Sequence, residues 1–541
     1  MNRIISFVLT TLVVVVFNSC NKSEPTPDNG AKVITLRDFS LDSQPLNFAY
    51  LGTSLTPQLT IKFSEPIDHT SAATAITMAA ATLDITFSNG DSTVTAKPTA
   101  ALRYLTTYAV VISKQLTSTN GKKFDAETVI RLTTQFDPSD KKPRISKDQL
   151  LDLVQKQTIK YFYDYAHPTS GMARERYGSG NTVTTGGTGF GIMAVIVGVE
   201  RNFIPRNDGI QHFNKLVTFL EKADRFHGAW SHWIDGSTGK VIPFSQKDDG
   251  GDLVETSFLV QGLITLRQYL QPADTVGNNM INRITKLWTA VEWDWYRKNN
   301  ENVLYWHWSP DYDWQMNFPM YGYFEEQITY ILAAASPTHG IPKIVYTNGY
   351  GNGGSIVKNN TYYNTKLPLG SPAPLFWVQY SYLGMDPHFS DDYANYWEQN
   401  VAATKIDQAY CIANPKKFYG YSDKCWGLTA SDQPSGYSAN DPNNDNGTIA
   451  PTAALASFPY LPDESTKAME FFYYTMGDKL WGDYGFYDAF SLSEGWFADS
   501  YLAIDQGPIV VMIENYRSGL LWDLFTSAPE IQQAKTVLDL H

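Results

Sequence analysis

Two stretches of the chain carry different hydrophobic periods. From residue 31 to about 136, apolar and polar positions alternate, as at Leu59, Ile61 and Phe63, and Asn89-Gly90 separates two such runs. A period of two and an Asn-Gly turn predict antiparallel strands and a hairpin. Residues 31–137 are therefore expected to form a small all-β sandwich.

After a polar linker at 138–146, the period becomes helical almost to the end of the chain. Ser146 and Gln149 match a capping box that predicts the first helix start. The predicted helices cover 147–165, 188–200, 206–223, 252–271, 277–297, 324–335, 372–384, 390–410, 448–457, 462–475 and 499–516. Their number and long loops indicate one large all-α domain over 147–541. A closed (α/α)6 toroid is the favoured architecture, with an open helical array as the alternative.

The first twenty residues predict export. Arg3 precedes an apolar run from Ile4 to Phe17, which is too short for an ordinary membrane span, and Cys20 follows. Residues 1–20 match a lipoprotein signal peptide with Cys20 as the lipidated residue, and 21–30 form a tether. The prediction is a lipid-anchored protein on the periplasmic or cell-surface face of the outer membrane. Secretion with a chance cysteine is the alternative.

Composition narrows the function classes. The net charge of −13 argues against nucleic acid and anionic membrane surfaces, so the anchor is the expected membrane contact. Nine His without paired spacing disfavour a zinc hydrolase, and no nucleophile elbow or phosphate loop is present. Gly186 to Gly191 is glycine-rich but follows no predicted strand. No cofactor or metal is expected, and the chain is expected to be a monomer. Cys411 and Cys425 form either one bridge or two free thiols.

Aromatic residues make up 14% of the chain, and six of the fourteen Trp lie between Trp288 and Trp314. Flat rings beside carboxylates and amides suit a cleft that stacks on sugar rings. The rings expected to be exposed there are Trp306, Trp308 and Trp314, with Tyr323 nearby. Trp293 and Trp295 fall in a helical pattern and are expected in the core.

The first acidic group is Asp252 and Glu255. Gly250 and Gly251 let the chain turn into a helix whose first turn carries both carboxyls on one side. The same spacing is that of a capping box, in which both side chains only satisfy backbone amides. A helix N-terminus lowers a carboxyl pKa, so Glu255 can act as an acid only if burial outweighs that effect.

Further acidic residues lie in later loops. Asp445 in the stretch Asn440 to Thr452 would suit a base that activates water, although the stretch also fits a polar turn that caps the next helix. Its Gly falls one place too late for an EF-hand. Glu325 and Asp505 are candidates for contact with a ligand or, alternatively, for partners of Arg517. Glu175 is a further candidate of the same kind.

Several motifs together resemble a known family, the glycoamylase-like domain that includes glycoside hydrolase family 144. They are Gly186 to Gly191, Asp249 to Phe258, Ser336 to His339, Asn446 to Ala453, and Ile504 to Pro508 with Met512 to Arg517. The stretches 60–67 and 107–112 resemble bacterial Ig-like domains. One departure is Phe324, where the family commonly has Asn before the Glu.

The resemblance implies an (α/α)6 toroid that hydrolyses β-glucan, with β-1,2 linkage, endo action and inversion at the anomeric carbon. It implies Glu255 as the general acid and Asp445 as the position of the general base, with Asp252, Glu175, Glu325 and Asp505 nearby. The alternatives are a surface lipoprotein that binds glycans without cleaving them, a β-glucosidase of other linkage specificity, and a lyase acting on acidic polysaccharide. The scarcity of clustered Arg and Lys disfavours the lyase.

Overall fold

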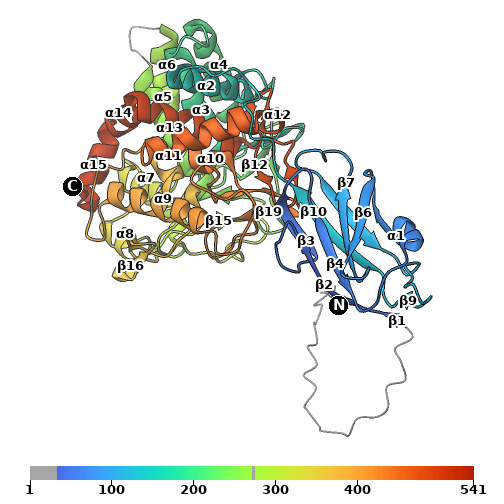
Figure 1. Cartoon of the computed structure of the whole chain (residues 1–541). Coiled ribbons are helices and arrows are strands. Elements are labelled where there is room, and N and C mark those ends of the chain that lie inside the picture. Colours follow the sequence, from blue (N-terminus) through green and yellow to red (C-terminus); the bar gives the residue numbers. More distant parts are fainter. Residues whose placement is uncertain (1–32, 271–274) are drawn as a thin grey trace. The chain divides into compact units, whose positions relative to one another are not determined.

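The computed structural model describes residues 33–270 and 275–541. Two compact units are present, one from residues before Arg131 and one from Leu132–His541 with the short segments Leu51–Leu55 and Arg103–Thr107 (Figure 1). The predicted signal peptide, with Cys20, and the predicted tether lie outside the described residues. The β unit precedes a large helical unit in the chain, as the two hydrophobic periods predict.

The β unit is built of two four-stranded sheets, in the orders β2-β4-β7-β6 and β3-β10-β8-β5. Their strands are β2 (Leu36–Leu41), β3 (Ala49–Thr53), β4 (Leu59–Phe63), β5 (Ile76–Met78), β6 (Leu83–Ser88), β7 (Thr93–Pro98), β8 (Thr107–Ile112) and β10 (Thr128–Thr134), with β1 (Val33–Ile34) paired to β9 (Lys123–Phe124). Leu59, Ile61 and Phe63 are buried, which confirms the alternation. The hairpin β6–β7 turns at Asn89 and Gly90, both at positive φ, as predicted. One helix, α1 (His69–Ala75), was not predicted.

The helical unit contains fourteen α-helices in its described part. They are α2 (Lys147–Tyr163), α3 (Thr185–Glu200), α4 (Arg206–Leu220), α5 (Leu253–Tyr269), α6 (Thr275–Thr289), α7 (Gln327–Ala335), α8 (Lys343–Asn348), α9 (Tyr396–Ala413), α10 (Pro451–Leu455), α11 (Pro462–Glu470), α12 (Gly477–Leu480), α13 (Ala503–Ser518), α14 (Leu520–Thr526) and α15 (Pro529–Leu538). The capping box of Ser146 and Gln149 is present at the start of α2. Most predicted helices are therefore confirmed, but α8, α12, α14 and α15 were missed.

Short strands join the helices and form hairpins in the loops. They are β11 (Thr182–Thr184), β12 (Trp233–Asp235), β13 (Val241–Ile242), β14 (Gly251–Asp252), β15 (His307–Trp308), β16 (Val357–Tyr362), β17 (Thr365–Leu369), β18 (Ala430–Gln433), β19 (Gly436–Ala439), β20 (Trp481–Gly482), β21 (Gly485–Phe486), β22 (Phe490–Ser491) and β23 (Trp496–Phe497). Gly186 to Gly191 does follow a strand, β11, contrary to the prediction. That strand pairs antiparallel with β12, so it is not the parallel unit of a dinucleotide fold.

Two predicted helices are wrong in detail. The stretch 372–384 forms only the 3₁₀ turns Leu375–Val378 and Tyr380–Tyr382, which are separated at Gln379, whose φ is −119°. The stretch 277–297 ends its helix at Thr289, and Trp295–Arg297 is a separate 3₁₀ turn. No helix in the described ranges combines the length and apolar run that a membrane crossing needs.

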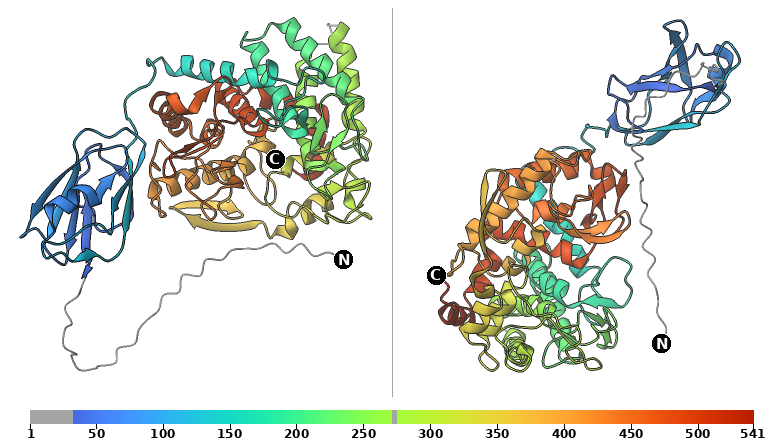
Figure 2. Two further views of the ribbon diagram at one scale, coloured as in Figure 1. Left: turned by 90° about the vertical axis from the view of Figure 1, so that its right-hand side faces the viewer. Right: turned by 90° about the horizontal axis from the view of Figure 1, so that it is seen from below.

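Helix α3 forms the centre of the helical unit. Residues 185–199 are buried all round, as expected for a helix enclosed by other helices. It packs against α5 and α13, and α13 also packs against α2, seen as red beside cyan in Figure 2. A Cβ at Gly189 would collide with the carbonyl of Phe258, and one at Gly262 would collide with the carbonyl of Gly189. The two glycines therefore permit the close crossing of α3 and α5.

Gly262→Ala should destabilise the helical unit, because its methyl group meets backbone that cannot rotate away. We expect the free energy of unfolding to fall by about 2–3 kcal/mol in urea titrations. The matched control is Gly209→Ala in α4, where the nearest atom is the Val199 Cγ2 methyl at 2.5 Å. Equal losses in both variants would contradict a backbone-limited crossing.

Candidate active site

The start of α5 holds the first acidic group. The Asp252 side chain accepts a hydrogen bond from the Glu255 amide at 2.9 Å, so Asp252 caps the helix. The Glu255 carboxyl does not return to the Asp252 amide, which instead donates to the Trp230 carbonyl. The interpretation that these side chains only cap the helix thus holds for Asp252 and is wrong for Glu255.

Glu255 is nearly buried, at 4% exposure, and its carboxyl points back to α3. Oε2 accepts a hydrogen bond from the Gly186 amide at 2.7 Å and lies 3.5 Å from the Thr184 hydroxyl. A Cβ at Gly186 would lie 2.6 Å from this oxygen, so only glycine fits there. Burial raises the pKa of Glu255, and the charge of Asp252 adds to the rise. Burial therefore outweighs the helix N-terminus in setting the pKa of this carboxyl.

Two histidines flank Asp252. His232 Nδ1 lies 3.0 Å from Asp252 Oδ2, and His307 Nε2 lies 3.7 Å from the same oxygen. Burial acts to lower the pKa of His232, but the carboxylates of Glu255 and Asp252 outweigh it and raise the pKa to about 9. Burial acts to raise the pKa of Asp252, but the bond from His232 outweighs it and leaves the pKa below its usual value. The pair is accordingly an imidazolium and a carboxylate at neutral pH.

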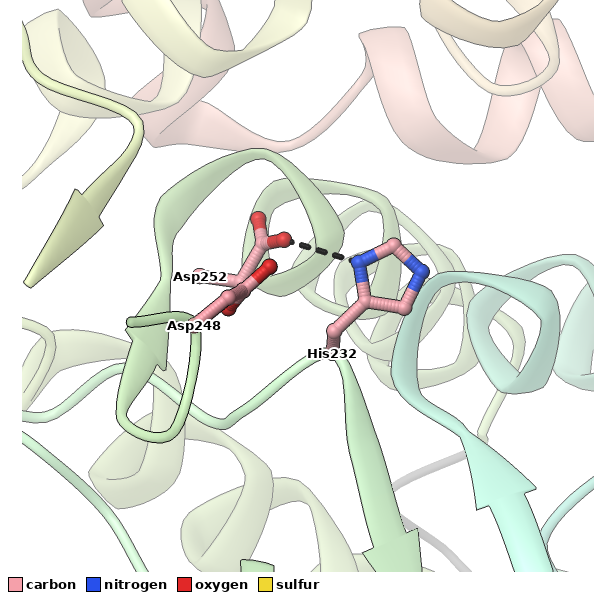
Figure 3. A group of neighbouring side chains, drawn as sticks. All are labelled: His232, Asp248 and Asp252. Carbon is pink, nitrogen blue, oxygen red and sulfur yellow. Dashed lines mark hydrogen bonds and ion pairs between the residues drawn. The ribbon is translucent and has the colours of Figure 1, made fainter. Parts of the chain in front are cut away.

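Asp248 completes this group from the loop before β14. Its carboxyl lies beside that of Asp252 in Figure 3 and 3.4 Å from His307 Nε2. Burial and the neighbouring charge of Asp252 raise the pKa of Asp248 to about 7. In the described ranges, donor atoms of His232, Asp248 and Asp252 lie within 4.8 Å of one another, close enough to hold a metal ion.

A cavity of about 430 Å³ opens at the start of α7. Its rings are Trp306, Phe324, Phe376 and Trp377, and its polar side chains include Glu325, Asp441 and Asn443. Burial raises the pKa of Glu325 to about 7, and the charges of Glu255 and Asp252 add to the rise. The pKa of Glu325 thus responds to the charges of the two α5 carboxyls. Phe324, the departure noted in the sequence, lies with its ring 4.5 Å from that of Trp377.

The exposure of the tryptophans differs from the prediction. Trp293 is buried, as expected, but Trp295 is 41% exposed, because it lies in the 3₁₀ turn after α6 and not in a helix. Trp306, Trp308 and Trp314 are half-buried, not exposed.

Only one of those three half-buried rings lines the cavity. Trp306 lies there, whereas Trp308 packs edge-on to His227 at 4.8 Å and Trp314 packs against Tyr305 at 5.6 Å. Tyr323 is buried and lies 6.3 Å from Trp377.

The Asp445 carboxylate accepts three hydrogen bonds from neighbouring groups of the chain. Oδ1 accepts from the Tyr421 hydroxyl at 2.7 Å and the Gly447 amide at 2.9 Å, and Oδ2 accepts from the Tyr410 hydroxyl at 3.0 Å. At 6% exposure the carboxyl is nearly buried. These bonds fit the structural interpretation of the loop, and the role as a base stays a prediction.

The remaining predicted residues form a second acidic group. Arg176 bridges Glu175 and Asp432, each at 3.0 Å. The Asp432 amide donates to Asp488 at 2.7 Å, and Asp488 lies against Asp505. Neither Glu325 nor Asp505 pairs with Arg517, which instead contacts Asp152 and Gln155. The alternative of an Arg517 partner is therefore wrong.

Raising the pH should weaken the folded state through Asp488 and Asp505. Burial raises the pKa of Asp488 to about 7 and that of Asp505 well above its ordinary 3.8, so the folded chain binds more protons than the unfolded chain between about pH 4 and 7. The free energy of unfolding should fall across this window by about 4 kcal/mol, because the pKa of Asp488 alone rises from 3.8 to about 7, at about 1.36 kcal/mol for each pKa unit. Asp505→Asn should reduce the slope, and the exposed Asp499→Asn should not. Identical slopes in both variants would contradict the shared proton.

Sequence reasoning missed His232, His307 and Trp377, and it placed Asp248 in the first acidic stretch without assigning it a role. His232 stands between Ser231 and Trp233, and His307 between two tryptophans, so a histidine beside loop tryptophans was the available signal. Their meeting depends on β14 pairing with β15, which sets Asp252 opposite His307. Cys411 and Cys425 are buried free thiols, so the bridge is not formed.

The chain is similar to known proteins in both its helical part and its β part. A family model described as "Putative glucoamylase" matches residues 317–529, and a bacterial Ig-like domain model matches 26–136. The chain is 47% identical over 414 residues to the exo β-1,2-glucooligosaccharide sophorohydrolase of Parabacteroides distasonis. That match covers 72% of this chain and 57% of the relative, so the chain spans little more than half of that protein's length.

Solved structures resemble the chain over a greater share of their length. The endo-β-1,2-glucanase of Chitinophaga pinensis, in complex with sophorotriose and glucose, is 54% identical with a TM-score of 0.72, covering 74% of this chain and 99% of that one. The β-1,2-glucanase of Parabacteroides distasonis is 37% identical with a TM-score of 0.71, covering 94% of this chain and 73% of that one. The chain therefore belongs to the glycoamylase-like family of glycoside hydrolases and carries a bacterial Ig-like domain at its N-terminal side.

Proposed function

We propose that the chain hydrolyses β-1,2-linked glucan with inversion at the anomeric carbon. The observation that carries this proposal is the buried Glu255, whose raised pKa keeps a proton available beside a second carboxyl, Glu325, in an aromatic cavity. The printed activities of the relatives from Chitinophaga pinensis and Parabacteroides distasonis support the substrate class.

In the proposed reaction Glu255 is the general acid. Its Oε2 is held by the Gly186 amide, so the proton resides on Oε1 and passes to the glycosidic oxygen as the bond from that oxygen to the anomeric carbon breaks. The leaving chain departs as a neutral alcohol. After Glu255 gives up its proton it is negatively charged. The ion pair between His232 and Asp252 then reduces the repulsion that Asp252 would otherwise exert on it.

Glu325 is our candidate for the general base. Its carboxylate accepts a proton from a water molecule whose oxygen bonds to the anomeric carbon, so one water is consumed for each bond broken. A base with a pKa of about 7 is well matched to neutral conditions. Asp445 is the alternative base, but its carboxylate already accepts three hydrogen bonds from groups of the chain itself.

We infer endo action and an (α/α)6 arrangement of the helices. The endo-acting relative is matched over 99% of its length, whereas the exo-acting relative is matched over 57% of its own. The paired, mutually packed helices α2, α3, α5 and α13 are consistent with a toroid. Product lengths separate the two modes, because endo action releases mixed oligosaccharides early and exo action releases sophorose alone.

The experiment that tests the function is a panel of β-glucans incubated with the purified chain without residues 1–20. Reducing ends should appear with β-1,2-glucan and not with β-1,3- or β-1,4-glucan. Proton NMR of the first products should show the α-anomer. Binding of β-1,2-glucan without release would favour the glycan-binding alternative, and cleavage of another linkage would favour a β-glucosidase of other specificity.

We also propose export and lipid anchoring at Cys20, from the apolar run that precedes it. The anchor would hold the enzyme at the outer membrane while the Ig-like domain spaces it from the surface. Labelled fatty acid should be incorporated into the full chain and not into Cys20→Ser, which should leave the membrane fraction.

A further inference from the structure

An exposed ring lies beside the acid, outside the cavity that Glu325 lines. Phe244 is 50% exposed, and its ring centroid lies 4.3 Å from that of His232 and 4.8 Å from that of Trp233. The Phe244 amide donates to the Asp248 carbonyl at 2.9 Å, which holds the ring on a turn between β13 and β14. One face of this turn thus presents an apolar surface to solvent.

His232 connects the Phe244 ring to the acid. The two rings are inclined by 35°, and the imidazole Nδ1 bonds to Asp252, whose other oxygen bonds to the Glu255 amide. The His232 side chain is 24% exposed, so a polar edge remains open beside the apolar face of Phe244. The turn therefore offers an exposed ring and a charged hydrogen-bonding edge within two contacts of Glu255.

We propose that Phe244 and His232 form a glucosyl-binding subsite next to Glu255, which takes the sugar unit adjoining the bond that is cleaved. The C–H face of the sugar lies on the Phe244 ring, and its hydroxyls meet the His232 edge, a combination of one apolar wall and few polar groups that is typical of ligand sites. The proposal rests on the proposed function for the substrate class.

The charges of the subsite select a neutral sugar. The carboxyls of Asp248, Asp252 and Glu255 lie around His232, so acidic groups outnumber the one basic group that an anionic sugar would meet here. An unsubstituted glucosyl unit meets no such penalty. The subsite is separate from the Glu325 cavity, because neither Phe244 nor His232 lines that cavity.

The test is binding of β-1,2-linked glucose oligomers to the Glu255→Gln chain, measured by calorimetry. Adding Phe244→Ala should weaken binding about tenfold or more, and Phe244→Tyr should restore it because the ring remains. The matched control is Phe48→Ala in the β unit, a ring 52% exposed that also packs on one neighbouring ring. Unchanged affinity in Phe244→Ala, at unchanged thermal stability, overturns the subsite.

Wild-type kinetics separate this proposal from the proposed hydrolysis. If the wild-type chain releases no products but Phe244→Ala still weakens binding in the Glu255→Gln chain, the subsite stands and the hydrolysis fails. If the wild-type chain cleaves and Phe244→Ala leaves kcat/KM unchanged, the subsite alone fails. Binding of an acidic oligosaccharide as tight as that of the neutral one overturns the charge selection.

Discussion

Glu255→Gln should lower kcat/KM on β-1,2-glucan by about 1,000-fold, within the range that general acid catalysis contributes. The amide keeps the size of the side chain and can remain near the Gly186 amide, but it has no proton to give to the leaving oxygen. Reducing-end release measured side by side for the two proteins, with circular dichroism to verify the fold, provides the comparison.

The leaving group makes this prediction specific to an acid. The leaving group of an activated aryl β-glucoside needs little protonation. The Glu255→Gln variant should therefore keep most of the wild-type activity on the aryl glucoside while losing activity on the glucan. Gly186→Ala is the matched positioning variant, because its methyl would lie 2.6 Å from Glu255 Oε2 and displace the carboxyl without removing it. Equal losses on both substrates for Glu255→Gln would contradict the assignment of Glu255 as the acid.

Glu325→Gln should lower kcat/KM by about 100-fold or more on both the glucan and the activated substrate, because the water must lose a proton in either case. In the wild type, kcat/KM should rise with pH through about 7, as Glu325 loses its proton and becomes able to accept one. That limb of the pH profile should be missing in Glu325→Gln. Rate measurements across pH on both substrates test the prediction.

Asp445→Asn is the matched comparison for the base. The carboxylate accepts from Tyr410, Tyr421 and Gly447, and an amide cannot accept all three bonds, so we expect lower stability with a smaller loss of kcat/KM than in Glu325→Gln. A large kinetic loss in Asp445→Asn at unchanged stability, with Glu325→Gln active, would transfer the base to Asp445.

Periodicity predicted the two units and most helices because each helix has its own sequence signal. The capping box at Ser146 and Gln149 and the hairpin at Asn89-Gly90 are local devices and were confirmed. The stretch 372–384 misled the prediction, since its apolar residues have helical spacing while the backbone breaks at Gln379 into two 3₁₀ turns. Trp295 misled it in the same way, because spacing does not show where a helix ends.

The candidate site was only partly visible in the sequence. Asp252 and Glu255 could be named because they share one helical turn, but the same turn could not tell which of them caps the helix. The choice depends on Gly186, sixty-nine residues earlier, whose amide takes up the Glu255 carboxyl. The sequence could not show whether Asp445 is a general base or a structural carboxylate, because its hydrogen-bond donors Tyr410 and Tyr421 lie on other segments of the chain.

The sequence by itself determined the order of a β unit and a helical unit, the start of α5 with its two carboxyls, and the family motifs, because these depend on neighbouring residues. Tertiary structure decided which carboxyls meet and which are protonated. Burial and the charges of His232 and Asp252 set the pKa of Glu255, while burial and the charges of Glu255 and Asp252 raise that of Glu325. These groups come from separate segments brought together by the crossing of α3 and α5 and the pairing of β14 with β15. A pKa depends on distance in space, which the order of residues does not contain.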